Sequence, residues 1–336
     1  MTATLPPTGP GSTRSVRLPL GVRLVGAVMR RGKAFSVAHM DEARLARLQQ
    51  TALPERGPVG LVLGRLPRSV QVETASLPGP QGDLPLRIYR PRGVSGTLPV
   101  VVAFHGGGFS LGSARQGDWL HGQVCAGVGA VVVAVDYRLA PTHRFPAAVE
   151  DCWAALEWTH EQAVELGADP DRLAVMGDSA GGNLAAVTSL IARDRGGPPV
   201  RHQALVYPAT DLTEALKEDR SYRENTLAVV LSNEDLEVFH GHYVDDGADP
   251  RDWRLSPILA PDHSGLPPAL VVLAGRDPLR DSGLRYAEKL AAAGVPVRVE
   301  EFHRMPHGFL GIPYLARDAR AAAAAVVAAQ REALDR

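Results

Sequence analysis

Ser179 has the sequence surroundings of a nucleophile. It lies in GDSAGG, residues 177–182, which follows the apolar run at 173–176 and opens an expected helix at 183–192. A Gly-x-Ser-x-Gly sequence between a strand and a helix predicts a sharp turn that exposes the serine hydroxyl. Glycines at 177 and 181 let backbone approach backbone there, and the helix amino terminus adds positive potential where negative charge develops. A glycine-rich helix start without chemistry would not need this placement, so the pattern indicates acyl transfer through a serine.

A serine nucleophile needs a base, and the base needs a group that holds its tautomer. Asp277 follows the apolar run at 269–274 and Gly275, so it is expected at the carboxyl end of a strand. His307 lies in MPHGF, on a loop expected after the last strand. We predict Asp277 as the acid and His307 as the base.

Two nearby residues are the alternatives for these roles. Asp281 competes with Asp277, but its expected place is the start of the next helix. His303 competes with His307, but it lies close to the strand, where a structural role is more natural. A metal site made of both histidines needs a helical i, i+4 pair, which Pro306 disfavours. We expect no metal.

The glycines of HGGGF, residues 105–109, come directly after another apolar run and permit two interpretations. They could cradle the pyrophosphate of a dinucleotide, with Asp136 at the ribose-binding distance, or they could aim amides at an oxyanion. The glycine spacing departs from the dinucleotide fingerprint. A serine, an acid and a base at strand ends require an oxyanion hole, so we predict that HGGGF supplies one together with the amide of Ala180, and that Asp136 is structural.

The order of elements predicts an α/β fold with a mostly parallel sheet flanked by helices. Strands are expected at residues 70–74, 84–89, 100–104, 131–136, 173–177, 204–207, 269–274 and 297–301, and helices at 16–31, 41–50, 147–166 and 319–334. Residues 69–336 would form the catalytic domain, and 1–68 a helical segment that is part of a cap. Residues 211–257 show no convincing strand and form a probable cap insertion.

The composition excludes several classes of protein. The 336 residues carry a formal net charge of −1 and 45% hydrophobic residues, which suits a large core and argues against nucleic acid as a partner. No apolar stretch reaches the roughly 18 residues of a membrane span, and residues 1–15 lack a secretory apolar region. Cys125 and Cys152 are expected to be buried free thiols. We predict a cytoplasmic protein with no cofactor and no stable membrane insertion, and the sequence leaves a homodimer open.

At this point the chain resembles the hormone-sensitive-lipase-like branch of the α/β-hydrolases, the carboxylesterases with HGGG upstream of GDSAGG. The resemblance runs from about residue 69 to the end and includes DYRLAP at 136–141, SPILAP at 256–261, DPLRDSG at 277–283 and HGF at 307–309. It implies that Gly107 and Gly108 donate to the oxyanion, supported by Gly106, and that Asp277 is the acid. The chain departs from the family at Thr142, where Glu is usual, and in its first 60 or so residues.

These observations predict a serine carboxylesterase that hydrolyses short- to medium-chain esters through an acyl-serine intermediate. A catalytically altered α/β-hydrolase that only binds small molecules is the alternative, but it would typically lack the serine or the histidine. A nicotinamide-dependent reductase is a third hypothesis, which a cofactor-binding titration tests. We also expect Leu45, Leu48 and Ala52 to form a buried apolar stripe that packs on the cap insertion and sets acyl-chain preference.

Overall fold

The computed structural model describes residues 18–23, 26, 36–51, 63–226, 230–245, 247–249 and 251–335. Among these residues, eight strands form a single sheet in the order β1-β2-β4-β3-β5-β6-β7-β8. Pairing is antiparallel between β1 and β2 and between β2 and β4, and parallel from β4 through β8. The strands are β1 (Val70–Gly79), β2 (Gly82–Pro91), β3 (Leu98–Phe104), β4 (Val131–Val135), β5 (Ala168–Asp178), β6 (Val200–Val206), β7 (Ala269–Arg276) and β8 (Val297–Pro306). The expected α/β fold with a mostly parallel sheet is confirmed.

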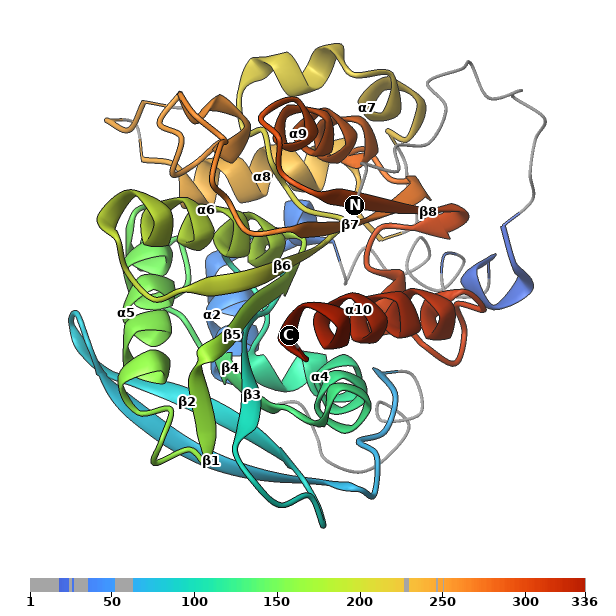
Figure 1. Cartoon of the computed structure of the whole chain (residues 1–336). Helices are drawn as coiled ribbons and strands as arrows, with labels where there is room; N and C mark the ends of the chain where they lie inside the picture. Colours follow the sequence, from blue (N-terminus) through green and yellow to red (C-terminus); the bar gives the residue numbers. More distant parts are fainter. Residues whose placement is uncertain are drawn as a thin grey trace.

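Helices cover both faces of this sheet (Figure 1). Along β3, the side chains of Val100, Val102 and Phe104 join one buried cluster, whereas Val101 and Ala103 join another. This alternation follows from the two-residue repeat of a strand, and both faces are apolar because both are covered. The first cluster includes side chains of α5 (Ala147–Glu161), α6 (Ala180–Arg195) and α9 (Arg280–Ala292), and the second includes side chains of α4 (Asp118–Val124) and α10 (Ala319–Leu334).

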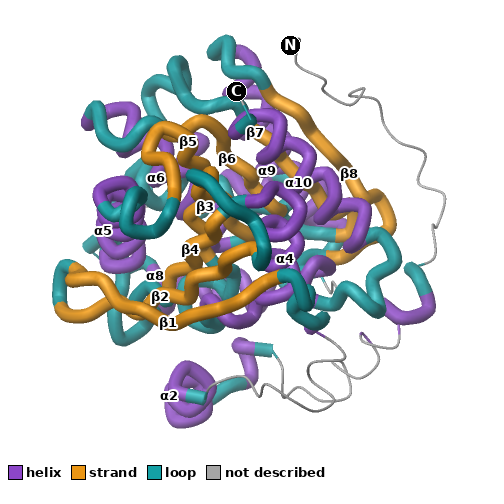
Figure 2. The backbone as a smooth tube through the Cα atoms, turned by 60° about the horizontal axis from the view of Figure 1, so that its bottom comes forward, coloured by secondary structure: helices purple, strands orange, loops and turns teal. Residues whose placement is uncertain are grey.

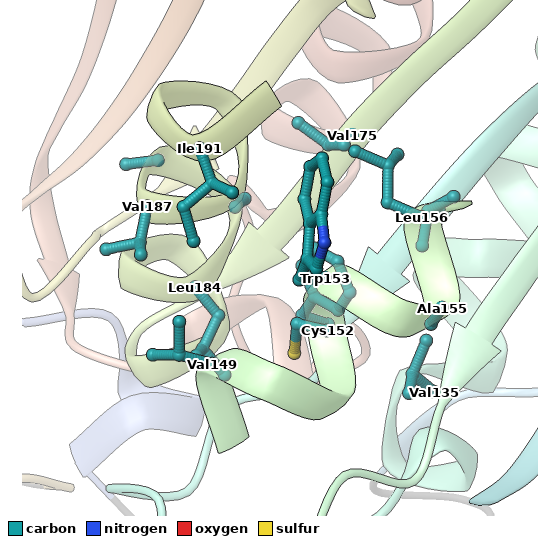
Figure 3. Packing of buried hydrophobic residues seen from close by; sticks show 14 of the residues in the cluster. Val135, Val149, Cys152, Trp153, Ala155, Leu156, Val175, Leu184, Val187 and Ile191 are labelled. Carbon is teal, nitrogen blue, oxygen red and sulfur yellow. The ribbon is translucent and has the colours of Figure 1, made fainter. Parts of the chain in front are cut away.

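The packing of α5 against α6 shows how the first cluster is filled. Trp153 on α5 lies between Val187 and Ile191 of α6 on one side and Leu156 on the other (Figure 3). Cys152 is fully buried beside it, and both cysteines are buried free thiols, as predicted. The sheet and its flanking helices therefore form a rigid base for residues at the strand ends.

Residues 211–257 lie between β6 and β7, and their described part contains helices and no strand, as predicted. These helices are the 3-10 helix η5 (Glu214–Glu218), α7 (Arg220–Glu224) and α8 (Asn233–Tyr243). Two N-terminal elements, the 3-10 helix η2 (Val37–His39) and α2 (Glu42–Gln50), precede the sheet in the chain. Figure 2 shows α2 apart from the strands of the sheet, and η2 contacts α8.

Three details differ from the sequence prediction or fall outside its test. The helix expected at 147–166 ends at Glu161, because residues 162–167 form a turn that buries Ala163 and Leu166 and closes with a bond from the amide of Ala168 to the carbonyl of Ala163. The expected stripe is wrong at Leu48, which is 43% exposed, although Leu45 is buried. Ala52 and most of the helix expected at 16–31 lie outside the described residues. None of the helices that the structure describes is long and apolar enough to cross a membrane.

Candidate active site

Ser179 stands at the turn between β5 and α6 with the backbone angles of a strained elbow. Its φ of 56° and ψ of −117° lie outside the regions that L-residues usually adopt. The turn is tight because Gly177 and Gly181 touch: a Cβ on Gly177 would come within 2.1 Å of the carbonyl oxygen of Gly181. The Ser179 amide donates to the carbonyl of Val206 at 2.9 Å, which ties the elbow to β6. The side chain is thereby presented at the carboxyl end of the sheet.

His307 and Asp277 extend from Ser179 as a chain of two short hydrogen bonds. His307 Nε2 lies 2.8 Å from Ser179 Oγ, and His307 Nδ1 lies 2.7 Å from Asp277 Oδ2. Asp277 directly follows β7 and is fully buried, and His307 directly follows β8 and is 5% exposed. The other carboxylate oxygen of Asp277 accepts a bond from the Leu279 amide at 2.9 Å. This geometry lets the imidazole take a proton from Ser179 while the carboxylate fixes its tautomer.

The two alternative residues lie apart from this chain of bonds. The His303 side chain is 76% exposed and contacts Glu301 at 3.0 Å. Asp281 lies in the first turn of α9 and accepts a bond from the Ser221 amide. The structure therefore brings together Ser179, Asp277 and His307, and leaves His303 and Asp281 in structural contacts.

Tyr207 supports the imidazole from the neighbouring strand end. Its backbone has a φ of 34°, and its ring centroid lies 4.8 Å from that of His307. Burial raises the pKa of the Tyr207 hydroxyl well above its ordinary value, so this side chain stays neutral beside the site. Sequence analysis missed Tyr207, because nothing in its local sequence indicates a positive φ.

The glycine loop, residues 105–109 after β3, packs directly on the elbow around Ser179. The amide of Gly106 donates to Asp178 Oδ1 at 2.9 Å, so Gly106 has a supporting contact and does not face the cavity. Gly108 has a φ of 59°, and a Cβ there would come within 2.3 Å of the Phe239 ring. In the described part of the chain, the amides of Gly107, Gly108 and Ala180 donate to no other group. Gly108 and Ala180 line the same cavity as Ser179, whereas Gly107 does not line it.

Asp178, next to Ser179, is a partly buried carboxylate that the sequence analysis did not single out, although it belongs to GDSAGG. Burial raises its pKa from 3.8 to about 6, opposed by the hydrogen bond from Gly106 and by the nearby His307. It joins the glycine loop to the elbow, so it holds together the two parts of the site.

Asp136 has the structural role that we predicted. Its carboxylate accepts a bond from the Ala114 amide at 2.6 Å, in the segment that follows the glycine loop. The loop is fixed further by the Tyr137 hydroxyl, which donates to the His105 carbonyl at 2.7 Å, and by Gln116, whose side chain donates to the Gly106 carbonyl. The Asp136 carboxylate, which the dinucleotide interpretation would place on a ribose, is thus bonded to a backbone amide.

A cavity of about 290 Å³ opens over Ser179. Its walls come from the glycine loop, the elbow and the insertion between β6 and β7. The lining residues are Gly108, Phe109, Ser179, Ala180, Ala209, Asp211, Leu212, Thr213, Glu214, Leu216, Lys217, Tyr222, Leu231, Leu236, Glu237, Phe239, His240 and Leu279. Among the described residues, none before Gly108 lines it, and no group of three or more His, Cys, Asp or Glu side chains is placed to hold a metal ion.

Comparisons with known proteins bear on the family and the activity of the chain. A family model described as the α/β hydrolase fold matches residues 101–311. The chain is 45% identical over 273 residues to the carboxylic ester hydrolase LipN of Mycobacterium tuberculosis, covering 80% of this chain and 72% of LipN. It is 43% identical over 304 residues to the carboxylesterase NlhH of the same species, covering 89% and 92%. Among solved structures, the ester hydrolase EH1AB1 from the metagenome of Lake Arreo, in complex with a derivative of bipyridine phosphonate, matches with a TM-score of 0.86 at 32% identity, covering 95% of this chain and 100% of that one.

Proposed function

The chain belongs to the hormone-sensitive-lipase-like branch of the α/β-hydrolase family and is a carboxylic ester hydrolase, and we propose that it cleaves short- to medium-chain esters through an acyl intermediate on Ser179. The observation that carries this proposal is the unbroken pair of hydrogen bonds from Ser179 Oγ through His307 to Asp277, at 2.8 and 2.7 Å. Ser179, at the end of this chain of bonds, lines the cavity.

In the acylation step, Ser179 Oγ attacks the ester carbonyl carbon as its proton passes to His307 Nε2. Asp277 stabilises the imidazolium that forms, and remains ionised. Negative charge develops on the former carbonyl oxygen, and the free amides of Gly107, Gly108 and Ala180 are the groups proposed to bind it. Removing one such donor typically lowers kcat by about 100- to 1000-fold. The tetrahedral intermediate then expels the alcohol, which takes the proton from His307.

In the deacylation step, a water molecule attacks the acyl-serine carbonyl while His307 accepts its proton. The same amides bind the second oxyanion, and collapse returns the proton from His307 to Ser179 Oγ and releases the carboxylic acid. At the end of the cycle, Ser179 and His307 have the protonation states with which they began, so the same three residues act in both steps.

The cavity supports the preference for shorter acyl groups. Its volume of about 290 Å³ lies just below the range of roughly 300 to 1,000 Å³ that is typical of pockets for small molecules. Apolar side chains of the insertion, including Leu212, Leu216, Leu231 and Phe239, form much of its wall. An aliphatic acyl group fits such a wall, because burial of each methylene contributes about 0.8 kcal/mol. The small volume of the cavity limits how many methylenes can be buried.

Replacing the nucleophile tests the mechanism. We expect Ser179→Ala to lower kcat on p-nitrophenyl butyrate by about 10⁴-fold or more, with an unchanged thermal unfolding midpoint, since one hydroxyl is lost from the cavity wall. Mass spectrometry after treatment with diethyl p-nitrophenyl phosphate should place the label on Ser179 in the unmodified protein. Substantial hydrolysis by Ser179→Ala, or a label on another residue, refutes the assignment.

The comparisons do not favour the alternative of a binding module without activity, because the relatives are named as ester hydrolases. The roles of residues 1–68 and 211–257 as parts of a cap, the cytoplasmic location and the homodimer stay predictions from the sequence. An absence of cofactor likewise remains an expectation.

A further inference from the structure

The N-terminal helix α2 makes a specific contact with the loop that carries the proposed oxyanion donors. Gln49, near the end of α2, donates from Nε2 to the carbonyl of Ser110 and to the carbonyl of Ala140, each at 2.8 Å. An amide nitrogen has two hydrogens, so both are used in these bonds. One side chain therefore links two loops that are 30 residues apart in the chain.

These two loops also bond to each other, which makes the contact a three-part junction. The Ala140 amide donates to the Phe109 carbonyl at 2.9 Å, one residue before Ser110. Gln49 thus adds a link between two segments that already bond to each other, and it belongs to an element that is distant from both in sequence. Its side chain is partly buried, so losing it would leave the two carbonyls without this donor.

The segment that Gln49 holds includes two neighbouring residues in the left-handed region of backbone angles. Phe109 has a φ of 58°, which disfavours any residue with a Cβ, and Gly108 before it has a φ of 59°. The Phe109 ring stacks on Tyr243 at the end of α8, with centroids 3.7 Å apart and planes 4° apart. Phe109 is therefore fixed by its ring on one side, and the adjacent Ser110 carbonyl is fixed by Gln49.

We infer that Gln49 is a positioning residue for the oxyanion hole: through Ser110 and Ala140 it holds the glycine loop so that the Gly107 and Gly108 amides point to the developing oxyanion. This inference rests on the proposed function. Gln49 does not line the cavity, so we expect its effect on transition-state stabilisation rather than on substrate binding. The inference gives the N-terminal segment a part in the chemistry, in addition to any part in the cap.

A matched pair of substitutions on α2 tests the inference in the full-length protein. Gln49→Met removes both donors and keeps the length of the side chain, and Gln50→Met makes the same change at the next position, where the side chain is exposed. Active sites are counted from the burst of p-nitrophenol released by diethyl p-nitrophenyl phosphate, so that kcat refers only to folded enzyme. Rates are then measured on p-nitrophenyl butyrate, and the inhibition constant of phenylboronic acid, which forms a tetrahedral adduct with the serine, is measured in parallel.

For Gln49→Met we expect kcat to fall about three- to tenfold with KM unchanged, less than the loss of an oxyanion donor itself. The phenylboronic acid constant should rise by a similar factor. Gln50→Met should match the unmodified protein, and Gln49→Lys, which retains donors, should recover part of the lost kcat.

Three results overturn the inference. They are a kcat per active site in Gln49→Met equal to that of Gln50→Met, a rise in KM alone, and a fall in kcat without weaker boronic acid binding. If Ser179 is not the residue that the phosphate labels, the proposed function fails, and this inference fails with it.

Discussion

At the scale of single residues, Asp178 is a carboxylate whose pKa departs far from its ordinary value. It lies between the elbow and the glycine loop, and partial burial raises its pKa from 3.8 to about 6. A raised pKa in the folded state means that the protonated form favours folding, and that this stabilisation is lost as pH rises through about 6. At neutral pH the buried charge therefore destabilises the fold, by about 3 kcal/mol as the upper limit.

Asp178→Asn removes this pH-dependent cost, since the amide carries no charge and still offers an oxygen to the Gly106 amide. We expect the unfolding midpoint of the variant, relative to that of the unmodified protein, to rise by a few degrees between about pH 4 and pH 8. Contacts that the new amide group gains or loses do not depend on pH. They therefore shift the difference in unfolding midpoint by the same amount at every pH, without changing how it varies with pH. Differential scanning fluorimetry across this range measures the difference, and a difference independent of pH contradicts the prediction.

The proposed serine, acid and base could be predicted from sequence because each comes after a segment that predicts a strand. Parallel strands bring their carboxyl ends to one edge, so residues placed directly after them meet there. Gln49 and Tyr207 could not be found in this way. Gln49 acts across 61 and 91 residues of sequence, and Tyr207 has a positive φ and contacts His307, which is distant in sequence. Long-range contacts of that kind leave no local pattern.

At the scale of elements, α8 is the part of the insertion that most directly faces the reaction. Phe239 on α8 lines the cavity, and its ring lies against the backbone of Gly108. An aromatic side chain at this point limits the space beside the proposed oxyanion donors. The element that closes the cavity therefore also restricts the acyl group that enters it.

Phe239→Ala should shift substrate preference toward longer acyl chains. We expect the ratio of kcat/KM for p-nitrophenyl octanoate to that for the butyrate to rise about threefold or more, because extra methylenes gain a place to be buried. Phe302→Ala is the matched control. Phe302 is half-buried against the second buried cluster, which includes side chains of α4 and α10, and it does not line the cavity. A ratio that changes equally in both variants, or in neither, contradicts the role of α8.

Most elements could also be predicted from sequence, and the exceptions have a common cause. The eight expected strands are all present, since the central ones are continuous apolar runs and the outer ones alternate apolar with polar residues. The helix expected to reach Leu166 ends at Glu161 because Ala163 and Leu166 are buried by a turn instead of by a further helical turn. Apolar residues at helical spacing predict burial, and a turn can satisfy the same requirement.

At the scale of the whole molecule, the N-terminal segment is tied to both sides of the cavity without lining it in the described part of the chain. Ser36 donates to Asp235 of α8 at 2.6 Å, and the Ala38 amide donates to the same carboxylate oxygen at 3.3 Å. Asp235 is buried and also forms the capping box of α8 with Ser232. Together with the bonds of Gln49 to the Ser110 and Ala140 carbonyls, these contacts connect the insertion to the glycine loop through residues 36–49.

This arrangement changes how the N-terminal segment would set acyl-chain preference. Leu48 is exposed, and the described N-terminal residues do not line the cavity, so the described part of the stripe that we expected from sequence forms none of its wall. The bonds from Ser36 and Ala38 would act instead by fixing the amino-terminal end of α8, whose other residues form the wall. Preference would then depend on the position of α8 and not on direct contact with the acyl group.

Deletion of residues 1–53 tests this dependence, because it removes the contacts with Asp235 and the contact of Gln49 together. We expect the octanoate-to-butyrate ratio to shift by about threefold, in addition to a lower kcat per active site from the loss of Gln49. Ser36→Ala in the full-length chain separates the two effects. It weakens the tie to α8 and leaves the bonds of Gln49 in place, so it should move the ratio in the same direction and leave kcat on butyrate close to normal. Circular dichroism and active-site counting establish that the shortened chain is folded. A folded deletion variant with an unchanged ratio would show that α8 holds its position without the N-terminal segment, and the dependence would be refuted.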